Sequence, residues 1–198
     1  MHTWCHCKAV LVKFSPAGDS PADQRTRDLL VCEQLALQIL SPAGLPAART
    51  QVFVGAGRVF LESERFDRTI SGANPQASLP GRVGMVSLQV YDAEYVGEMD
   101  NWAATAHCMA ARKLLNTEDA QTLRLLKAYG VLIANTDRHY GNISLLIKDD
   151  DWVLSPTLGS WAQAKALAAQ FWQSVAADTR VSEGFRAIAA ENLYKISL

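Results

Sequence analysis

Eight consecutive residues carry most of the chemical information in this sequence, namely Asn135-Thr136-Asp137-Arg138-His139-Tyr140-Gly141-Asn142. Apolar periodicity predicts a helix before them, over 123–134, and an apolar run predicts a strand after them, over 143–147. An acid followed five residues later by asparagine is the spacing of a phosphotransferase catalytic loop. In such a loop Asp137 accepts a hydroxyl proton, and the amide oxygen of Asn142 holds Mg²⁺, which prefers oxygen ligands.

The same residues also have a purely structural interpretation, which the spacing alone leaves open. A polar turn between a helix and a strand favours aspartate, asparagine and glycine, because these residues readily form turns. This interpretation explains Asp137, Gly141 and Asn142. It does not explain why Arg138 and His139 occur in the same turn.

Three motifs resemble the HipA family, the kinase-fold toxins of bacterial toxin–antitoxin systems. Residues 135–142 resemble its catalytic loop, Glu64-Arg65-Phe66-Asp67-Arg68 resembles its hinge, and Val12-Lys13-Phe14 resembles its lysine strand. The motifs occur in the order of the family, and the similarity runs from about residue 9 to residue 157. It is closest to the YjjJ-like (HipH-like) branch of the family.

The resemblance implies an α+β fold, a partial protein-kinase-like arrangement of two lobes. A small β-rich N-lobe remnant with the lysine strand, a helix and the hinge would occupy residues 1–68. A mainly helical C-lobe with the catalytic loop would occupy residues 69–198. The cofactors implied are ATP and Mg²⁺.

On the nucleotide side, the resemblance assigns roles to four residues. Lys13 would reach the nucleotide phosphates, and Glu33 on the next helix would form a buried ion pair with it. Backbone groups near Glu64 and Phe66 would hold the adenine. The alternatives are an exposed lysine at a strand end for Lys13 and a solvated helix face for Glu33.

On the catalytic side, the resemblance makes Asp137 the base and Asn142 a metal ligand, with His139 and Arg138 structuring the loop. A weaker alternative keeps the metal but changes the chemistry to phosphodiester cleavage. In that case His139 would be the base that activates the nucleophile.

Two departures from the family pattern predict impaired catalysis. A second metal-binding acid is expected after the strand that follows the loop, but Ser155-Pro156-Thr157 is followed by Leu158-Gly159-Ser160, as if a segment had been deleted. Only twelve residues precede Lys13, so we expect an N-terminal truncation without the glycine-rich phosphate loop. Each lost contact to the transition state costs about 2–4 kcal/mol.

Composition describes an ordinary globular protein of 198 residues, with 49% hydrophobic residues and a net charge of −1. This charge gives no indication of direct nucleic-acid or membrane binding. The N-terminus lacks the basic start and apolar core of a signal peptide, so a cytoplasmic location is expected. Four residues near the start could bind a metal, namely His2, Cys5, His6 and Cys7, but reduced thiols on a frayed or strand-forming N-terminus are the simpler interpretation. Cys32 and Cys108 fit small core positions.

Periodicity and turn residues predict the remaining elements. Helices are expected over 28–40, 101–115 and 161–198, and another helix begins at the cap Thr117-Glu118-Asp119 and runs to 134. Strands are expected over 9–14, 50–54, 58–62 and 152–154. Residues 84–91 are expected to form a short strand or an extended segment. Residues 15–25 and 71–82 are expected to be loops. The three acids 149–151 fit a solvated hairpin turn better than a metal site.

These expectations support more than one function. The first is a HipA-like toxin, an ATP- and Mg²⁺-dependent serine/threonine kinase acting on the translation machinery and controlled by an antitoxin, with impaired catalysis. The second is a catalytically dead pseudokinase that binds an antitoxin, a DNA-bound partner or a full-length relative. A decayed gene without activity is the remaining alternative.

Overall fold

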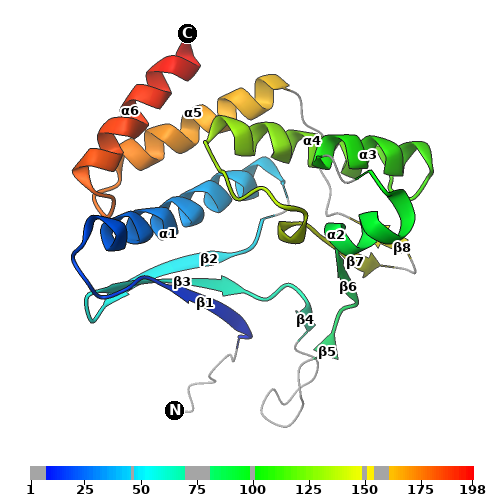
Figure 1. Cartoon of the computed structure of the whole chain (residues 1–198), viewed down its shortest axis with the longest axis horizontal. Coiled ribbons are helices and arrows are strands. Elements are labelled where there is room, and N and C mark those ends of the chain that lie inside the picture. The colour runs from blue at the N-terminus through cyan, green and yellow to red at the C-terminus, as the bar shows by residue number, and fades with distance from the viewer. Residues whose placement is uncertain (1–7, 46, 70–80, 99–100, 149–150, 154–160) are drawn as a thin grey trace, which may run out of the picture.

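The computed structural model describes residues 8–45, 47–69, 81–98, 101–148, 151–153 and 161–198 (Figure 1). Its long helices lie together on one side, and a three-stranded sheet lies on the other. The first long helix is sandwiched between that sheet and the last two helices. The N-terminal residues His2, Cys5, His6 and Cys7 and the stretch 155–160 lie outside the described residues.

The three-stranded sheet is antiparallel, with the order β1-β3-β2. Its strands are β1 (Val10–Phe14), β2 (Thr50–Gly55) and β3 (Arg58–Glu64). β2 and β3 form the expected hairpin through Ala56 and Gly57, whose φ angles are 50° and 68°. Positive φ at both turn residues gives the turn type whose twist matches that of the strands.

Helix α1 (Pro21–Leu40) begins seven residues before the expected position at residue 28. Ser20 caps it, because its hydroxyl accepts the Asp23 amide while the Asp23 carboxylate accepts the Ser20 amide. Pro21 occupies the first turn, where its missing amide hydrogen has no consequence. The expected loop over 15–25 was therefore wrong in its second half, because a capping box and an N-terminal proline have the composition of a loop. A 3₁₀ turn, η1 (Ser41–Ala43), follows.

The remaining strands form two further sheets. One pairs β4 (Arg68–Thr69) with β5 (Gly81–Arg82), and the other has the order β6-β7-β8, with β6 (Met85–Ser87), β7 (Ser144–Lys148) and β8 (Asp151–Val153). The extended segment expected over 84–91 ends early, because the Ser87 hydroxyl caps a helix by accepting the Val90 amide. That helix, α2 (Leu88–Tyr91), continues into a π-helical turn, η2 (Asp92–Val96).

The remaining helices are α3 (Trp102–Ala111), α4 (Thr117–Leu132), α5 (Trp161–Ala177) and α6 (Glu183–Ser197). The cap of α4 is Asn116, one residue before the expected Thr117; its side chain accepts the Asp119 amide at 2.7 Å and donates to the Asp119 carboxylate at 2.8 Å. Among the described residues, no helix is both long and apolar enough to cross a bilayer.

Two hydrophobic cores meet on α4. The larger core joins α1, β3, α5 and α6 to the C-terminal half of α4, through Leu125 and Tyr129. The smaller core joins α2, α3 and β7 to the N-terminal half, through Ala120 and Leu123. The larger core includes residues from both expected lobes, so packing alone does not separate the lobes. The division of the chain near residue 68 stays a prediction. α4 itself is held by both cores.

Cys32 and Cys108 occupy the expected kind of position. Cys32 is buried, and burial raises the pKa of its thiol to about 12, so it remains protonated at neutral pH. Cys108 is half-buried, and its thiol donates to Glu98 at 3.4 Å.

One hydrogen bond from α4 to α1 can be removed without leaving a cavity. The Tyr129 hydroxyl donates to the Ala36 carbonyl at 3.1 Å, and Tyr129 is only 3% exposed. We expect Tyr129→Phe to lower the free energy of unfolding by about 1 kcal/mol. Tyr194→Phe, on an exposed position of α6, is the matched control and should leave it unchanged. Urea denaturation followed by circular dichroism measures both, and equal stabilities would contradict a contribution from this bond.

Candidate functional site

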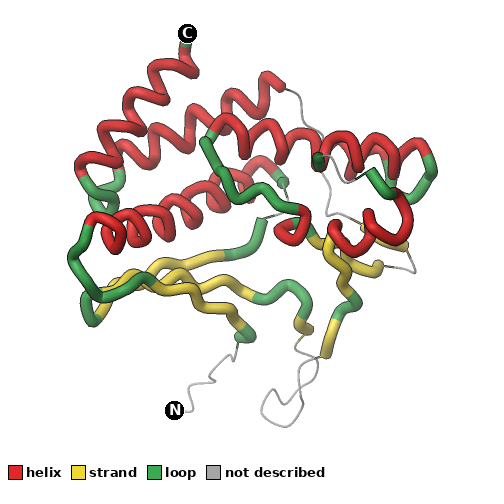
Figure 2. The backbone as a smooth tube through the Cα atoms, in the orientation of Figure 1, coloured by secondary structure: helices red, strands yellow, loops and turns green. Residues whose placement is uncertain are grey.

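The loop between α4 and β7 starts with a sharp reversal of the chain (Figure 2). After the helix, Ala134 adopts a left-handed conformation with a φ of 55°, and the Asn135 amide donates back to the Gly130 carbonyl at 2.9 Å. The Asn135 side chain then accepts the Asp137 amide at 2.9 Å. The loop is thus anchored to the end of a doubly buried helix.

Arg138 fastens the loop to α4 from the outside. Its guanidinium donates to the carbonyls of Gly130, at 3.2 Å, and Asn135. A Cβ on Gly130 would lie 2.8 Å from Cδ of Arg138, so the glycine leaves room for the arginine to cross the helix. This geometry explains the arginine that turn preferences left unexplained, and it supports the expected structuring role.

Three expected functional residues form one exposed group in this loop. Nδ1 of His139 accepts the Gly141 amide at 3.1 Å, so the ring proton is on Nε2, which faces Oδ1 of Asp137 at 3.5 Å. The amide nitrogen of Asn142 donates to the Asp137 carbonyl at 2.6 Å. Its amide oxygen and the Asp137 carboxylate therefore remain available to a cation.

Tyr140 anchors the loop to the smaller core, through residues that the sequence did not single out. The buried Thr105 hydroxyl donates to the buried Asp92 carboxylate at 3.1 Å. Since that uses the only threonine hydroxyl proton, the Tyr140 hydroxyl donates to Thr105, at 2.9 Å. No local sequence pattern could reveal this series of hydrogen bonds, because Thr105 is 13 residues from Asp92 and 35 residues from Tyr140.

Lys13 and Glu33 form the ion pair that the resemblance implied. The Lys13 ammonium donates to both carboxylate oxygens of Glu33, at 2.7 and 3.0 Å. The expectation that this pair is buried was wrong, because the side chains are 64% and 38% exposed. Lys13 belongs to β1, an edge strand on which only Val10 is even half-buried, so the described residues cover the pair only in part.

The hinge is held by a compact ion-pair cluster around Asp67. Arg65 and Arg68 donate to its carboxylate at 2.6 and 2.5 Å, as expected for structural ion pairs. The hydrogen bond from Arg65 is the main cause that lowers the pKa of Asp67 to about 2. The amide of Glu64 donates to the Arg49 carbonyl, and that of Arg65 donates to the Ala9 carbonyl.

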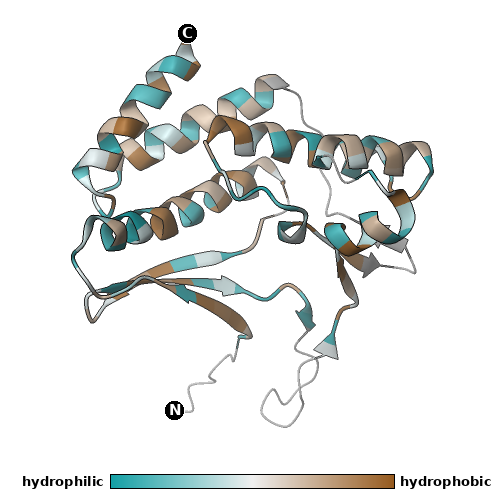
Figure 3. Ribbon diagram, viewed as in Figure 1, coloured by the Kyte–Doolittle hydropathy of each residue, from teal (hydrophilic) through white to brown (hydrophobic). Residues whose placement is uncertain are grey.

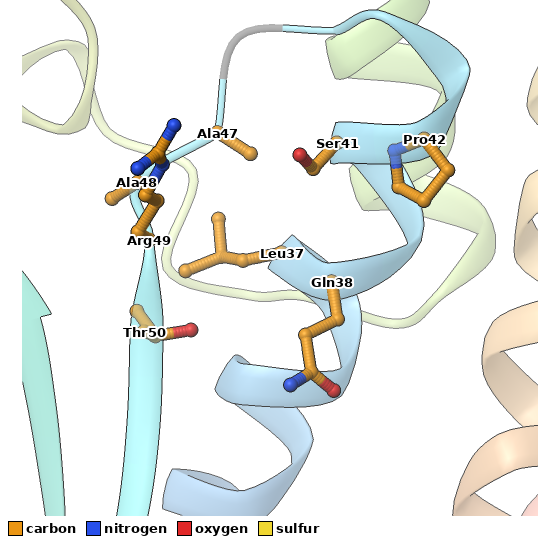
Figure 4. A pocket seen from close by; sticks show the side chains of 8 residues that line it. All are labelled: Leu37, Gln38, Ser41, Pro42, Ala47, Ala48, Arg49 and Thr50. Atoms are coloured by element: carbon orange, nitrogen blue, oxygen red, sulfur yellow. The ribbon is translucent and has the colours of Figure 1, made fainter.

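A cleft of about 570 Å³ brings the hinge next to the loop. Its lining residues come from the hinge, the segment around the end of α1, α4 and the loop: Glu64, Arg65, Phe66, Arg68, Leu37, Ala47, Ala48, Arg49, Leu126, Asn142, Ile143, Ser144 and Leu146. A smaller hollow of about 270 Å³ lies beside it and shares part of that wall (Figure 4). The cleft thus unites Glu64, Phe66 and Asn142. Neither the Lys13–Glu33 pair nor the Asp137–His139 pair lines it.

The loop offers a cation few ligands. Within the described residues, no group of three His, Cys, Asp or Glu side chains could hold a metal ion. Asp137 and Asn142 supply two oxygen-bearing side chains on one turn. Mg²⁺ commonly uses one or two protein oxygens together with water and substrate phosphates. The loop therefore fits a magnesium ion that arrives with a polyphosphate and does not form a resident all-protein site.

Residues 5–189 match the HipA-like C-terminal domain. The chain belongs to the HipA family. Toxin YjjJ of Escherichia coli (strain K12) is 33% identical over 220 residues, which confirms the expected branch. That match covers 96% of this HipA-family chain and 48% of the toxin, so the chain spans about half the length of this curated relative. Because the aligned span is longer than the 198-residue chain, the alignment includes gaps on this side.

The fold has a counterpart in a solved structure. A chain in the Shewanella oneidensis MR-1 complex of HipA, HipB and operator DNA superposes with a TM-score of 0.50. The match covers 84% of this HipA-family chain and 54% of that chain, at 11% identity. At this identity the likeness concerns the fold alone, and it confirms the expected α+β, HipA-like kinase fold.

The Asp67 cluster makes the stability of the hinge depend on pH. The carboxyl pKa is lowered from 3.8 to about 2, so its contribution is complete above 3.8 and is lost as pH falls through 2. We expect the free energy of unfolding to fall more steeply between pH 4 and pH 2 in the wild type than in Asp67→Asn. Asp19→Asn, at an exposed position, is the control and should follow the wild type. Parallel pH profiles of the wild type and Asp67→Asn in chemical denaturation would contradict the ion-pair assignment.

Proposed function

We propose that this chain is the kinase-fold part of a HipA-like toxin and that it binds ATP with Mg²⁺ between the hinge and the catalytic loop. Backbone groups near Glu64 and Phe66 hold the adenine, and Lys13, oriented by Glu33, contacts the phosphates. The Phe66 amide donates to no described residue, whereas the amides of Glu64 and Arg65 are already used inside the sheet. Phe66 is therefore the natural hinge donor.

The observation that carries this proposal is the Lys13–Glu33 pair. The two residues are 20 positions apart, on β1 and α1, and the ammonium still contacts both carboxylate oxygens. A solvated helix face and an exposed strand end, the two alternatives from the sequence, do not require any contact between them. A lysine held in this way presents its charge at a fixed place, as phosphate binding requires.

The proposed reaction transfers the γ-phosphoryl group of ATP to a serine or threonine hydroxyl of a protein of the translation machinery. Asp137 accepts the hydroxyl proton while the oxygen–phosphorus bond forms and ADP leaves. Asn142 is held through its amide nitrogen, and its amide oxygen would be a ligand for Mg²⁺, which supplies neutralisation of phosphate charge when bound. With only Asp137 and Asn142 of the loop proposed as metal ligands, we infer slow transfer, since each missing electrostatic contact costs about 2–4 kcal/mol. This activity would take place in the cytoplasm, under control of an antitoxin.

The second candidate, a partner-binding pseudokinase, is favoured by one observation. Phe14, Phe60 and Phe53 are paired across the three strands and therefore share the sheet face that is turned away from α1. Phe14 is 61% and Phe53 44% exposed, and β1 is hydrophobic along most of its length (Figure 3). Such a face suits an antitoxin, a DNA-bound partner or a full-length relative.

The phosphodiesterase alternative receives no support from the loop geometry. A general base needs a free lone pair. In His139, Nδ1 accepts the Gly141 amide and Nε2 faces the Asp137 carboxylate, so neither nitrogen is free to activate a nucleophile.

Calorimetric titration with ATP tests the proposal on protein shown to be folded by circular dichroism. We expect binding that is stronger with Mg²⁺ than without it, and loss of this Mg²⁺ effect in Asp137→Ala, Asn142→Ala. Lys13→Met should weaken binding about tenfold or more, because a charge-assisted contact to phosphate is lost.

Lys195→Met is the matched control for the lysine substitution. Lys195 forms a 2.7 Å pair with Glu191 and is 63% exposed, close to the 64% of Lys13, but it lies on α6. Its loss should leave ATP affinity unchanged. A folded wild type that shows no ATP binding in this titration would refute nucleotide binding and favour the pseudokinase that binds a protein partner.

A further inference from the structure

The turn between α5 and α6 holds helix α1 from the side opposite the sheet. Asp28 of α1 is only 2% exposed, and its carboxylate accepts the Ser182 amide at 2.9 Å and the Ser182 hydroxyl at 2.5 Å. Gln24 completes its contacts at 2.9 Å. A buried carboxylate with three donors fixes its neighbours firmly, because an unsatisfied charge would be costly there.

A second contact from the same turn reaches α1 farther along. Arg180 donates to the side chain of Gln34 at 2.9 Å, and Gln34 is only 5% exposed. Asp178 holds the guanidinium in place through hydrogen bonds from Nε and Nη2. Gln34 directly follows Glu33, the partner of Lys13, so this contact sets the helix beside the functional pair.

The contacts at Asp28 and Gln34 restrain both the position of α1 along its axis and its rotation about that axis. Asp28 and Gln34 are six residues apart, which is about 9 Å along a helix and more than one and a half turns. The Lys13–Glu33 pair cannot supply this restraint itself. It is exposed, and exposed ion pairs contribute about 0–1 kcal/mol.

We propose that Asp28, Ser182 and Arg180 are positioning residues for the Lys13–Glu33 pair, so that the α5–α6 hairpin sets the phosphate-binding lysine from more than 140 residues away in sequence. The proposal rests on the proposed nucleotide binding for its effect on ATP. The mechanical part, the holding of α1 by the hairpin, stands on the hydrogen bonds alone.

The test compares two serine-to-alanine variants on the same helical hairpin. Ser182→Ala removes the hydroxyl contact to Asp28, whereas Ser197→Ala removes only a local bond to the Leu193 carbonyl at 2.8 Å within α6. Because Ser182 also caps α6, Arg180→Met serves as a second variant that spares the cap. Asp28→Asn serves as the conservative variant, since its amide can keep the contacts with Ser182 and Gln24.

Two readouts are measured at a temperature at which all variants remain folded. Hydrogen exchange monitored by mass spectrometry should show faster exchange of residues 21–40 in Ser182→Ala and Arg180→Met, with α3, which packs in the other core, unchanged. ATP affinity by calorimetry should fall about threefold to tenfold in the same variants. Ser197→Ala should match the wild type in both, and Asp28→Asn should lie between.

The outcomes separate this inference from the proposed function. If the wild type binds no ATP, the proposed function fails, and the exchange data still decide whether the hairpin holds α1. If exchange of α1 accelerates while ATP affinity stays at the wild-type value, the contacts are merely structural and the positioning role is overturned. Unchanged exchange in both Ser182→Ala and Arg180→Met overturns the inference altogether.

Discussion

Burial of helix α4 on two sides is the constraint on which the arrangement of the site depends. Ala120 and Leu123 pack into the smaller core, whereas Leu125 and Tyr129 pack into the larger one. A helix buried in two cores at once can neither slide nor rotate without disrupting both, because close-packed interiors yield little. The catalytic-type loop begins at the end of this helix, so the position of the helix sets where the loop starts. α5 adds to this restraint, since the Trp172 indole donates to the Leu132 carbonyl at 3.0 Å, at the last residue of α4.

Polar contacts then shape the loop on that rigid support, and most of them do not involve the groups proposed to react. Arg138 crosses α4 over Gly130, and Tyr140 reaches the buried Thr105 hydroxyl. Arg138 lies between Asp137 and His139 in the sequence and Tyr140 follows directly, so both anchors hold the backbone next to the exposed Asp137–His139 pair. Half-buried residues thus hold the backbone, and the exposed carboxylate and amide oxygens of the loop face solvent, where a cation or substrate could reach them.

The sequence predicted local structure well where one signal dominated. Apolar periodicity placed α3 and α4, and Gly55-Ala56-Gly57 placed the hairpin between β2 and β3. The single helical segment expected over 161–198 is divided into α5 and α6. It misplaced elements where two signals share one composition: the capping box of α1 has the residues of a loop, and the start of α2 has those of a strand. Contacts between distant residues were beyond local patterns. Lys13 and Glu33 were linked only through family resemblance, and the Asp28–Ser182 contact was not anticipated at all.

In the proposed function, the few oxygen ligands of the loop affect phosphoryl transfer, whereas the Lys13–Glu33 ion pair affects nucleotide binding. In the proposed function, binding of a nucleotide relies on the hinge and on Lys13, and the structure holds each of them through ion pairs. Transfer of a phosphoryl group also requires charge neutralisation in the transition state, where each fixed contact has a large effect on rate. A chain that keeps the first set of features and only part of the second therefore retains binding more readily than catalysis. Under the proposed function, the position of α1, held by the α5–α6 hairpin, would then link the C-terminal part of the chain to nucleotide binding.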